Sequence, residues 1–199
     1  GSLAAGEVNG ETQVVWGDGY GYMHAFRAPD LSESSGEEPM DLERIWWADG
    51  NPHHYRYAED GSERQFPIGG YKRPDGILRK TGPSHFIGTP VFYGGKVYAA
   101  IGRDRVYNHT HRGLALGPGT LTCFDPTGTG NVTDTHIVWQ NTEMGRSQSS
   151  PSIVDGRLYL SSTDGNLYVV DPECGSIISR TDLEHAVLER SQMIAAQGL

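Results

Sequence analysis

The stretch SPSIVDGRLYLSSTDGNLYVVDP, residues 150–172, decides the fold. It predicts three short strands, because apolar runs alternate with two Asp-Gly turns and end at an Asp-Pro pair. Related stretches occur at residues 9–26 and, interrupted by an insertion, at residues 89–126. A repeated unit cannot bury its apolar face alone, so the repeat predicts sheets stacked on one another.

The first and last copies of the repeat agree in register. Gly10 and Gly19 are nine residues apart, as are Gly156 and Gly165. In the middle copy the agreement resumes only after residues 103–118, which are therefore an insertion. The agreement indicates one structural unit repeated along the chain rather than unrelated hairpins.

Tryptophan-containing segments 44–47 and 136–139 precede the second and third copies, and we expect each to begin its unit. Four antiparallel strands every 40 to 50 residues, roughly, is the pattern of a β-propeller blade. The sequence therefore predicts an all-β fold: a propeller of four-stranded antiparallel blades, with about two full and two partial blades in an incomplete ring. The expected bounds are a partial blade at 9–30, a blade at 42–128 with insertions at 50–82 and 103–118, a blade at 136–175, and the start of another at 176–199.

Composition and charge exclude several functional classes. The 27 glycines and 10 tyrosines are typical of an all-β protein with many hairpins. A formal net charge of -9 argues against binding nucleic acid, which needs a basic surface. We expect no membrane span, because there is no apolar run of about 18 residues, and residues 1–10 lack the regions of a signal peptide.

Residues 163–175, TDGNLYVVDPECG, resemble the repeat of pyrroloquinoline-quinone-type (PQQ-like) β-propellers. Further similarity to this family occurs at 16–19, 45–47, 88–93 and 121–126. The resemblance implies a bacterial protein exported to the periplasm or the cell exterior. Within the family, quinoprotein dehydrogenases hold PQQ and calcium over the propeller axis, whereas an outer-membrane assembly lipoprotein binds no cofactor and holds proteins with its loops.

The resemblance implies the fold but not the catalysis. The dehydrogenases of the family carry adjacent cysteines, whereas Cys123 and Cys174 are 51 residues apart and form either two isolated thiols or, in an exported protein, a disulfide. We therefore expect a non-catalytic scaffold that binds a protein or a glycan through loops 28–41, 50–82 and 103–118. The alternative is part of a quinoprotein dehydrogenase that oxidises alcohols or sugars with PQQ and calcium, its cofactor ligands lying mostly outside this segment.

The long loops contain the candidate ligand-binding residues. Aromatic side chains in the loop at 50–82 are suited to line a glycan- or peptide-binding surface, with ordinary loop packing as the alternative. The candidate set is His53, His54, Tyr55, Tyr57, Tyr71, Arg103 and Tyr107.

His109 and His111 are the candidate metal ligands. On an extended segment, residues two apart point the same way, so the pair suits a metal if another loop supplies a third ligand. The alternative is a pair of solvated loop histidines. No cofactor is expected outside the dehydrogenase alternative.

The expected partial blades also suggest an assembly. If the strand expected at 176–183 joined the strands of residues 9–30, they would complete one blade, within one chain or across a homodimer.

Overall fold

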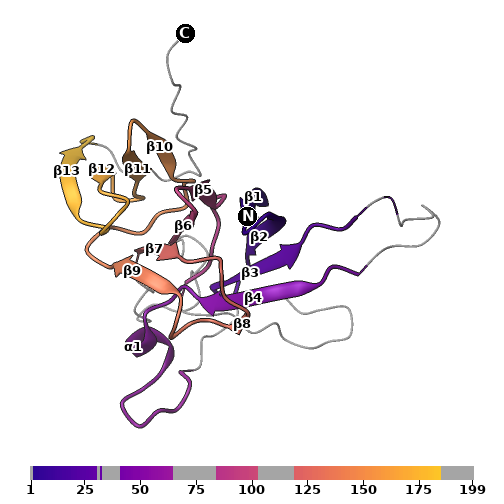
Figure 1. Ribbon diagram of the computed structural model, residues 1–199. Coiled ribbons are helices and arrows are strands. Elements are labelled where there is room, and N and C mark those ends of the chain that lie inside the picture. The colour runs from indigo at the N-terminus through magenta and orange to yellow at the C-terminus, as the bar shows by residue number, and fades with distance from the viewer. Residues whose placement is uncertain (1, 31, 33–40, 65–83, 103–118, 185–199) are drawn as a thin grey trace, which may run out of the picture.

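The computed structural model describes residues 2–30, 32, 41–64, 84–102 and 119–184. Three sheets follow one another in an arc, and each consists mainly of four antiparallel strands (Figure 1). The expected fold class, an all-β arrangement of four-stranded antiparallel sheets in an incomplete ring, is confirmed. Among the described residues, no helix is long and apolar enough to cross a membrane.

The first sheet has the order β1-β2-β3-β4-β8, in which β8 alone runs parallel to its neighbour. Its strands are β1 (Ala4–Val8), β2 (Glu11–Gly17), β3 (Tyr22–Arg27), β4 (Arg44–Asp49) and β8 (Gly130–Asn131). The second sheet contains β5 (Val91–Tyr93), β6 (Lys96–Ile101), β7 (Thr120–Phe124) and β9 (Ile137–Asn141). The third sheet contains β10 (Ser152–Val154), β11 (Arg157–Ser161), β12 (Asn166–Val170) and β13 (Ile177–Asp182).

The strands are shared among the sheets differently from the expected bounds. Each tryptophan-containing segment closes the sheet before it: β4 pairs with β3, and β9 pairs with β7. In the same way β13 is the fourth strand of the third sheet, not the start of another. The first sheet also has an opening strand, β1, where none was expected. The physical reason is that period-two patterning identifies a strand without identifying the neighbour to which it hydrogen-bonds.

Two of the hairpin turns are formed by the residues that the sequence indicates. Asn9 and Gly10 both have positive φ, at 52° and 82°, and Asp155 and Gly156 repeat this at 49° and 68°. Two successive positive φ angles define the tight turn that matches the twist of a hairpin. The first strand of each of these two sheets is thereby linked to the second.

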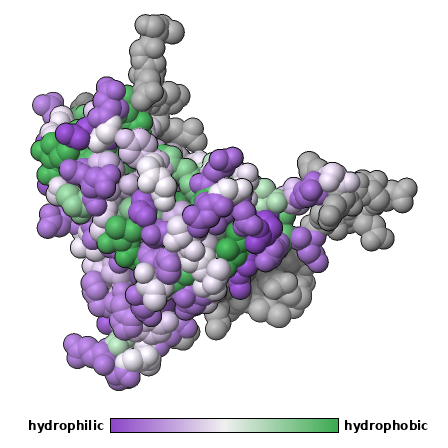
Figure 2. Space-filling view, in the orientation of Figure 1, coloured by the Kyte–Doolittle hydropathy of each residue, from purple (hydrophilic) through white to green (hydrophobic). Residues whose placement is uncertain are grey.

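Two apolar clusters hold the arc together. The first lies between the first and second sheets, and the second lies between the second and third. Along β6, Val97, Ala99 and Ile101 belong to the first cluster, whereas Tyr98 and Ala100 belong to the second. The middle sheet is therefore apolar on both faces, as expected for a sheet packed between two others. On the face shown in Figure 2, apolar residues form separate patches among polar ones.

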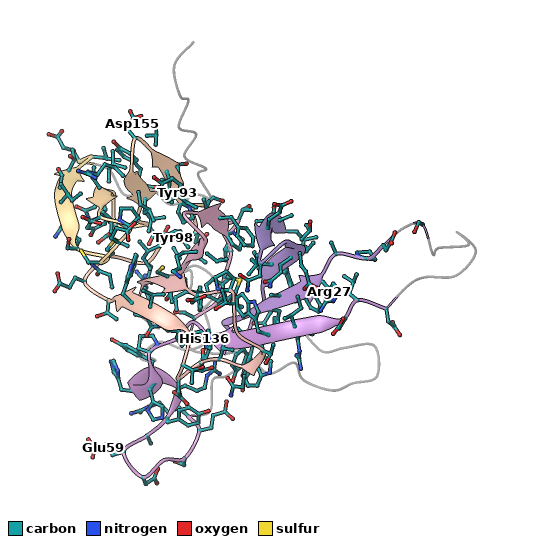
Figure 3. All side chains as sticks on the ribbon, viewed as in Figure 1. Arg27, Glu59, Tyr93, Tyr98, His136 and Asp155 are labelled. Atoms are coloured by element: carbon teal, nitrogen blue, oxygen red, sulfur yellow. The ribbon has the colours of Figure 1, made fainter. Side chains whose placement is uncertain are left out.

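One short helix follows the first sheet. The helix α1 (His53–Arg56) begins after Pro52, and the chain then turns back so that Tyr57 bridges to Glu63. Figure 3 shows Glu59 at the tip of this turn, away from the sheets. This segment is the described part of the insertion expected at 50–82, and it borders the site below.

Candidate functional site

A cavity of about 320 Å³ lies beside the end of β4. Its lining comes from the first sheet, from the segment of α1, from β9 of the second sheet and from the connection that leads to β9. Its lining residues are Tyr22, Trp47, Asp49, Asn51, His53, Tyr57, Asn131, Thr133, Asp134, Ile137 and Gln140. We call this cavity the β4 pocket.

Aromatic rings form one wall of the β4 pocket. Tyr22 and Trp47, on neighbouring strands, meet edge to face with ring centres 5.3 Å apart. His53 and Tyr57 lie at opposite ends of α1, four positions apart, and their ring centres are 4.7 Å apart. Such surfaces bind the apolar face of a ligand ring and leave its polar edge to other groups.

Amide and hydroxyl groups line the pocket beside the aromatic rings, since Asn131 on β8 pairs with Trp47 on β4. The Thr133 hydroxyl accepts a hydrogen bond from the Asp49 amide at 3.0 Å and donates one to Asn131 Oδ1 at 2.8 Å. Gln140 Nε2 donates to the Gly50 carbonyl at 3.2 Å and to the Thr122 hydroxyl at 3.3 Å. Within the described residues, no partner engages the Asn131 amide NH₂ or the Gln140 carbonyl oxygen, so both are available to a ligand.

A buried ion pair stands behind the aromatic wall. The Arg56 side chain is fully buried and bonds both carboxylate oxygens of Asp49, with Nη2 at 2.9 Å from Oδ1. Its guanidinium carbon lies 4.6 and 4.5 Å from the ring centres of Tyr20 and Tyr22, a double cation-π contact. Burial opposes the charge, but the bonds to Asp49 outweigh it and raise the pKa of Arg56. Burial also raises the pKa of Tyr22 to about 12, so its phenol stays neutral.

Asn51 links this ion pair to the following loop. Its side-chain amide donates to Asp49 Oδ1 at 3.0 Å, and its Oδ1 accepts from the Ser84 amide at 3.0 Å. Gly21, at φ +90°, allows the close approach, because a Cβ there would lie 2.0 Å from Asn51 Nδ2. Hydrogen bonds from Arg56 and Asn51 therefore fix the position of the Asp49 carboxylate.

The turn before β3 is organised by Asp18. Its Oδ1 accepts from the amides of Tyr20 and Tyr22, both at 2.8 Å, and its Oδ2 lies 3.2 Å from His24 Nε2. Burial alone would raise the pKa of Asp18, but these hydrogen bonds outweigh it, so the pKa of the folded carboxyl is lowered. The turn places Tyr22 in the pocket wall.

We expect acid to weaken this turn. Because the folded pKa of Asp18 lies below the unfolded value of about 3.9, its stabilising contribution is full above that pH and is lost as pH falls through the folded pKa. Asp18→Asn should lower the free energy of unfolding by about 1–2 kcal/mol at pH 7 and flatten its fall between pH 5 and pH 2, roughly. Urea titrations across this range measure both effects. Asp155→Asn, at an exposed hairpin turn, is the control and should change neither, and an unaltered slope in Asp18→Asn would contradict the assignment.

The structure separates the predicted ligand-binding residues. His53 and Tyr57 line the β4 pocket, whereas His54 and Tyr55 do not and instead lie against each other, with ring centres 4.3 Å apart. The remaining predicted residues, including both candidate metal ligands, lie outside the described residues: Tyr71, Arg103, Tyr107, His109 and His111.

The structure bears on the state of the two cysteines and on possible metal-binding groups. Cys123 is buried and Cys174 is exposed, and both are free thiols. Burial raises the pKa of Cys123 to about 12, which keeps it protonated and unreactive. Within residues 2–30, 41–64, 84–102 and 119–184, no three His, Cys, Asp or Glu side chains lie together in a group that could hold a metal ion.

Several pocket residues were not predicted from the sequence. Trp47 had a signal, because tryptophans occur in both β4 and β9 and mark these segments as strands. Asp49 shared that signal only as the last residue of β4. Asn131, Thr133 and Gln140 had none, because they reach the pocket from more than 80 positions away along the chain.

Comparisons with solved structures find proteins of low sequence identity to this chain. The chain is 15% identical to a europium-containing methanol dehydrogenase, with a TM-score of 0.52, over 94% of this chain and 35% of the dehydrogenase. It is 13% identical to BamB from Moraxella catarrhalis over 89% of this chain and 49% of BamB, with a TM-score of 0.31. It is 12% identical to glutaminyl cyclase from Myxococcus xanthus over 92% of this chain and 55% of the cyclase, with a TM-score of 0.32.

No protein-family description matches the sequence, and no curated protein matches it. The chain spans about a third of the length of the methanol dehydrogenase. At this identity the likeness shows the fold alone, and it agrees with the three stacked four-stranded sheets: the chain has the architecture of a β-propeller.

Proposed function

We propose that this chain is part of a non-catalytic β-propeller scaffold that binds a glycan in the β4 pocket. The observation that supports the proposal is the composition of the pocket walls. Rings of Trp47, Tyr22 and Tyr57 line a cavity of about 320 Å³ together with the amides of Asn131 and Gln140 and the hydroxyl of Thr133. A sugar ring has the matching chemistry, with an apolar face of C–H groups and an edge of hydroxyls.

The pocket favours a glycan over a protein partner. At about 320 Å³ it falls within the size range of small-ligand sites, roughly 300–1,000 Å³. A stable protein interface instead needs about 800 Å² from each partner. The charge of Asp49 is also balanced by Arg56, and Asp134 is exposed to solvent, so the described lining buries no uncompensated charge and suits an uncharged saccharide.

The alternative, part of a quinoprotein dehydrogenase, is supported by the likeness in fold to a europium-containing methanol dehydrogenase. PQQ and calcium would then be the cofactors, and an alcohol or a sugar the substrate. The ligands of these cofactors would lie mostly outside this segment, and the carboxylates in the described lining of the β4 pocket are Asp49, already bonded to Arg56, and Asp134. Our proposal is the scaffold because the pocket walls suit a sugar.

The family resemblance supports a location in the periplasm or outside the cell, and both that location and assembly with a second copy stay predictions. Fractionation of the producing cells would test the location. Neither bears on whether the pocket binds a sugar.

Calorimetric titration with cellotriose, xylotriose, maltotriose and N-acetylchitotriose tests the proposal. We expect at least one to bind and to change tryptophan fluorescence, since Trp47 lies in the wall. Trp47→Ala and Tyr57→Ala should weaken binding about tenfold or more, because base- or sugar-sized rings gain about 1–3 kcal/mol from an aromatic face. Tyr55→Ala and His54→Ala are the matched controls and should bind as the wild type does.

Two outcomes would reject the glycan proposal. One is the absence of binding to every trisaccharide at millimolar concentration. The other is an equal loss in the Tyr55→Ala control, which would show that the pocket is not the site. Dye-linked oxidation of methanol or glucose after addition of PQQ and calcium would favour the dehydrogenase alternative instead.

A further inference from the structure

The three sheets stack through equivalent positions. The glycines Gly10, Gly95 and Gly156 close the first hairpin of each sheet, so residues can be matched by counting from them. The second residue after the glycine is Val97 in the second sheet and Leu158 in the third, and each packs into the cluster shared with the sheet before it. Each sheet therefore has one face toward its predecessor and one toward its successor.

A hydrogen bond repeats at both junctions. The third residue after the glycine is Gln13 in the first sheet and Tyr98 in the second. Gln13 Nε2 donates to the Pro126 carbonyl at 3.2 Å, and the Tyr98 hydroxyl donates to the Pro172 carbonyl at 3.3 Å. Both carbonyls belong to Asp-Pro pairs that follow the third strand of the next sheet. Figure 3 shows Tyr98 at the junction of the second and third sheets.

The third sheet has the same donor without an acceptor. Tyr159 occupies the position of Gln13 and Tyr98, and no described residue accepts a hydrogen bond from its hydroxyl. Tyr159 pairs across the strands with Val169, and both lie on the face opposite to Leu158 and Leu160, which pack on the second sheet. This face, with Leu167, is half-buried and has no sheet beside it among the described residues.

The first sheet has the complementary face. Val14, Trp16 and Phe26 lie on the face that corresponds to the face of Ala99, Ile101 and Phe124 in the second sheet, where these three residues are buried against the preceding sheet. In the first sheet no described sheet covers them, and Trp16 is 37% exposed. His24, on the same face between Trp16 and Phe26, stacks with Trp16.

The acceptor also has a counterpart in the first sheet. The backbone amides of Arg27, Asp125 and Asp171 each donate to the carbonyl of the residue just before the fourth strand of their own sheet. By this bond, the three residues occupy equivalent positions in the three sheets. The carbonyls that follow are those of Pro126, Pro172 and, in the first sheet, Ala28. Ala28 is therefore the acceptor that a preceding sheet would use.

We propose that the third sheet of one chain docks on the first sheet of a second copy of this chain. Tyr159 then donates to Ala28 of the other copy, and Val169 packs against the face that includes Trp16. The contact is head to tail, since each copy uses two different faces. Two copies with three sheets each would form a ring of six sheets, within the range of about four to eight blades known for propellers.

Sedimentation velocity and light scattering test this arrangement. We expect the wild-type protein at about 10–100 μM to have twice the chain mass of 21.7 kDa. Trp16→Arg and Val169→Arg should each be monomeric, because each places a charge in both contacts of the ring. Val138→Arg, at an exposed valine of β9 outside either face, is the matched control and should remain a dimer.

Mixing the two monomeric variants distinguishes the head-to-tail contact from a symmetric one. The third sheet of Trp16→Arg and the first sheet of Val169→Arg are both intact, so the mixture should form a heterodimer through one contact. Tyr159→Phe should weaken the wild-type dimer about two- to tenfold, whereas Tyr93→Phe should not. A monomeric wild type at 100 μM, roughly the upper limit for a specific dimer, would overturn the proposal, as would a dimer that Val169→Arg leaves intact. Circular dichroism confirms that each variant is folded.

Discussion

Arg56→Met is expected to lower the free energy of unfolding by about 3–5 kcal/mol. The guanidinium is fully buried, bonds both oxygens of Asp49 and donates to the Tyr20 carbonyl at 2.9 Å. Its removal leaves the Asp49 carboxylate buried without a counter-charge, which costs more than the pair itself contributes. Urea denaturation followed by tryptophan fluorescence measures the change.

Arg27→Met is the matched control for this prediction. Arg27 also pairs with two carboxylates, those of Glu11 and Glu43, but its side chain is 41% exposed. Exposed pairs contribute about 0–1 kcal/mol, so the control should be nearly as stable as the wild type. In Asp49→Asn/Arg56→Met the unpaired charge is gone, and part of the lost stability should return. Equal losses in the two arginine variants would show that burial of the pair has no special effect.

Phe124→Ala is expected to cost about 3–5 kcal/mol, because it opens a cavity in the cluster between the first and second sheets. The Phe124 side chain is fully buried, and its ring centre lies 6.2 Å from that of Trp46 and 6.4 Å from that of Phe86. Aromatic contacts add to the transfer free energy that the substitution removes. The midpoint of urea unfolding and the melting temperature should both fall.

The control for the cavity is Tyr93→Ala in the same sheet. Tyr93 is the last residue of β5 and is 40% exposed. Its loss should cost about 1 kcal/mol or less. A small effect of Phe124→Ala, with an unchanged dependence on urea, would mean that the two sheets are not held together by this cluster.

Local structure was predictable from the sequence where a turn demands particular residues. The pairs Asn9-Gly10 and Asp155-Gly156 both take up the positive φ angles that a two-residue hairpin needs. Few residue types adopt these angles, so the signal is strong and it identifies the strands on either side. The all-β fold and the stacking of sheets follow from the same signal, because the hairpins repeat.

Strand pairing was not predictable, and the expected blade bounds were shifted as a result. The segment that contains Trp46 reads as a strand whether it joins the sheet before it or the sheet after it. The structure pairs it with β3, and the Trp46 indole donates to Gln13 of the same sheet at 3.0 Å. Both arrangements satisfy the same alternation of apolar and polar residues, so only the three-dimensional contacts distinguish them.

About half of the pocket's aromatic wall could be expected from the sequence. His53 and Tyr57 stood out as an aromatic cluster, but so did His54 and Tyr55, which α1 turns away from the pocket. The helical turn decides between them, because residues four apart share a face and adjacent residues do not. The polar wall depends on contacts such as Gln140 with Gly50, which no local pattern encodes.

The connection between β7 and β9 crosses to the first sheet, and this determines how the molecule unfolds. Its short strand β8 pairs with β4, the Val132 amide donates to the Trp47 carbonyl, and the Val132 side chain enters the first cluster. The second sheet therefore cannot unfold without separating β8 from β4 at the edge of the first sheet. Amide protons of the first two sheets should thus exchange with solvent in one cooperative step, which makes this pair of sheets the smallest unit that opens as a whole.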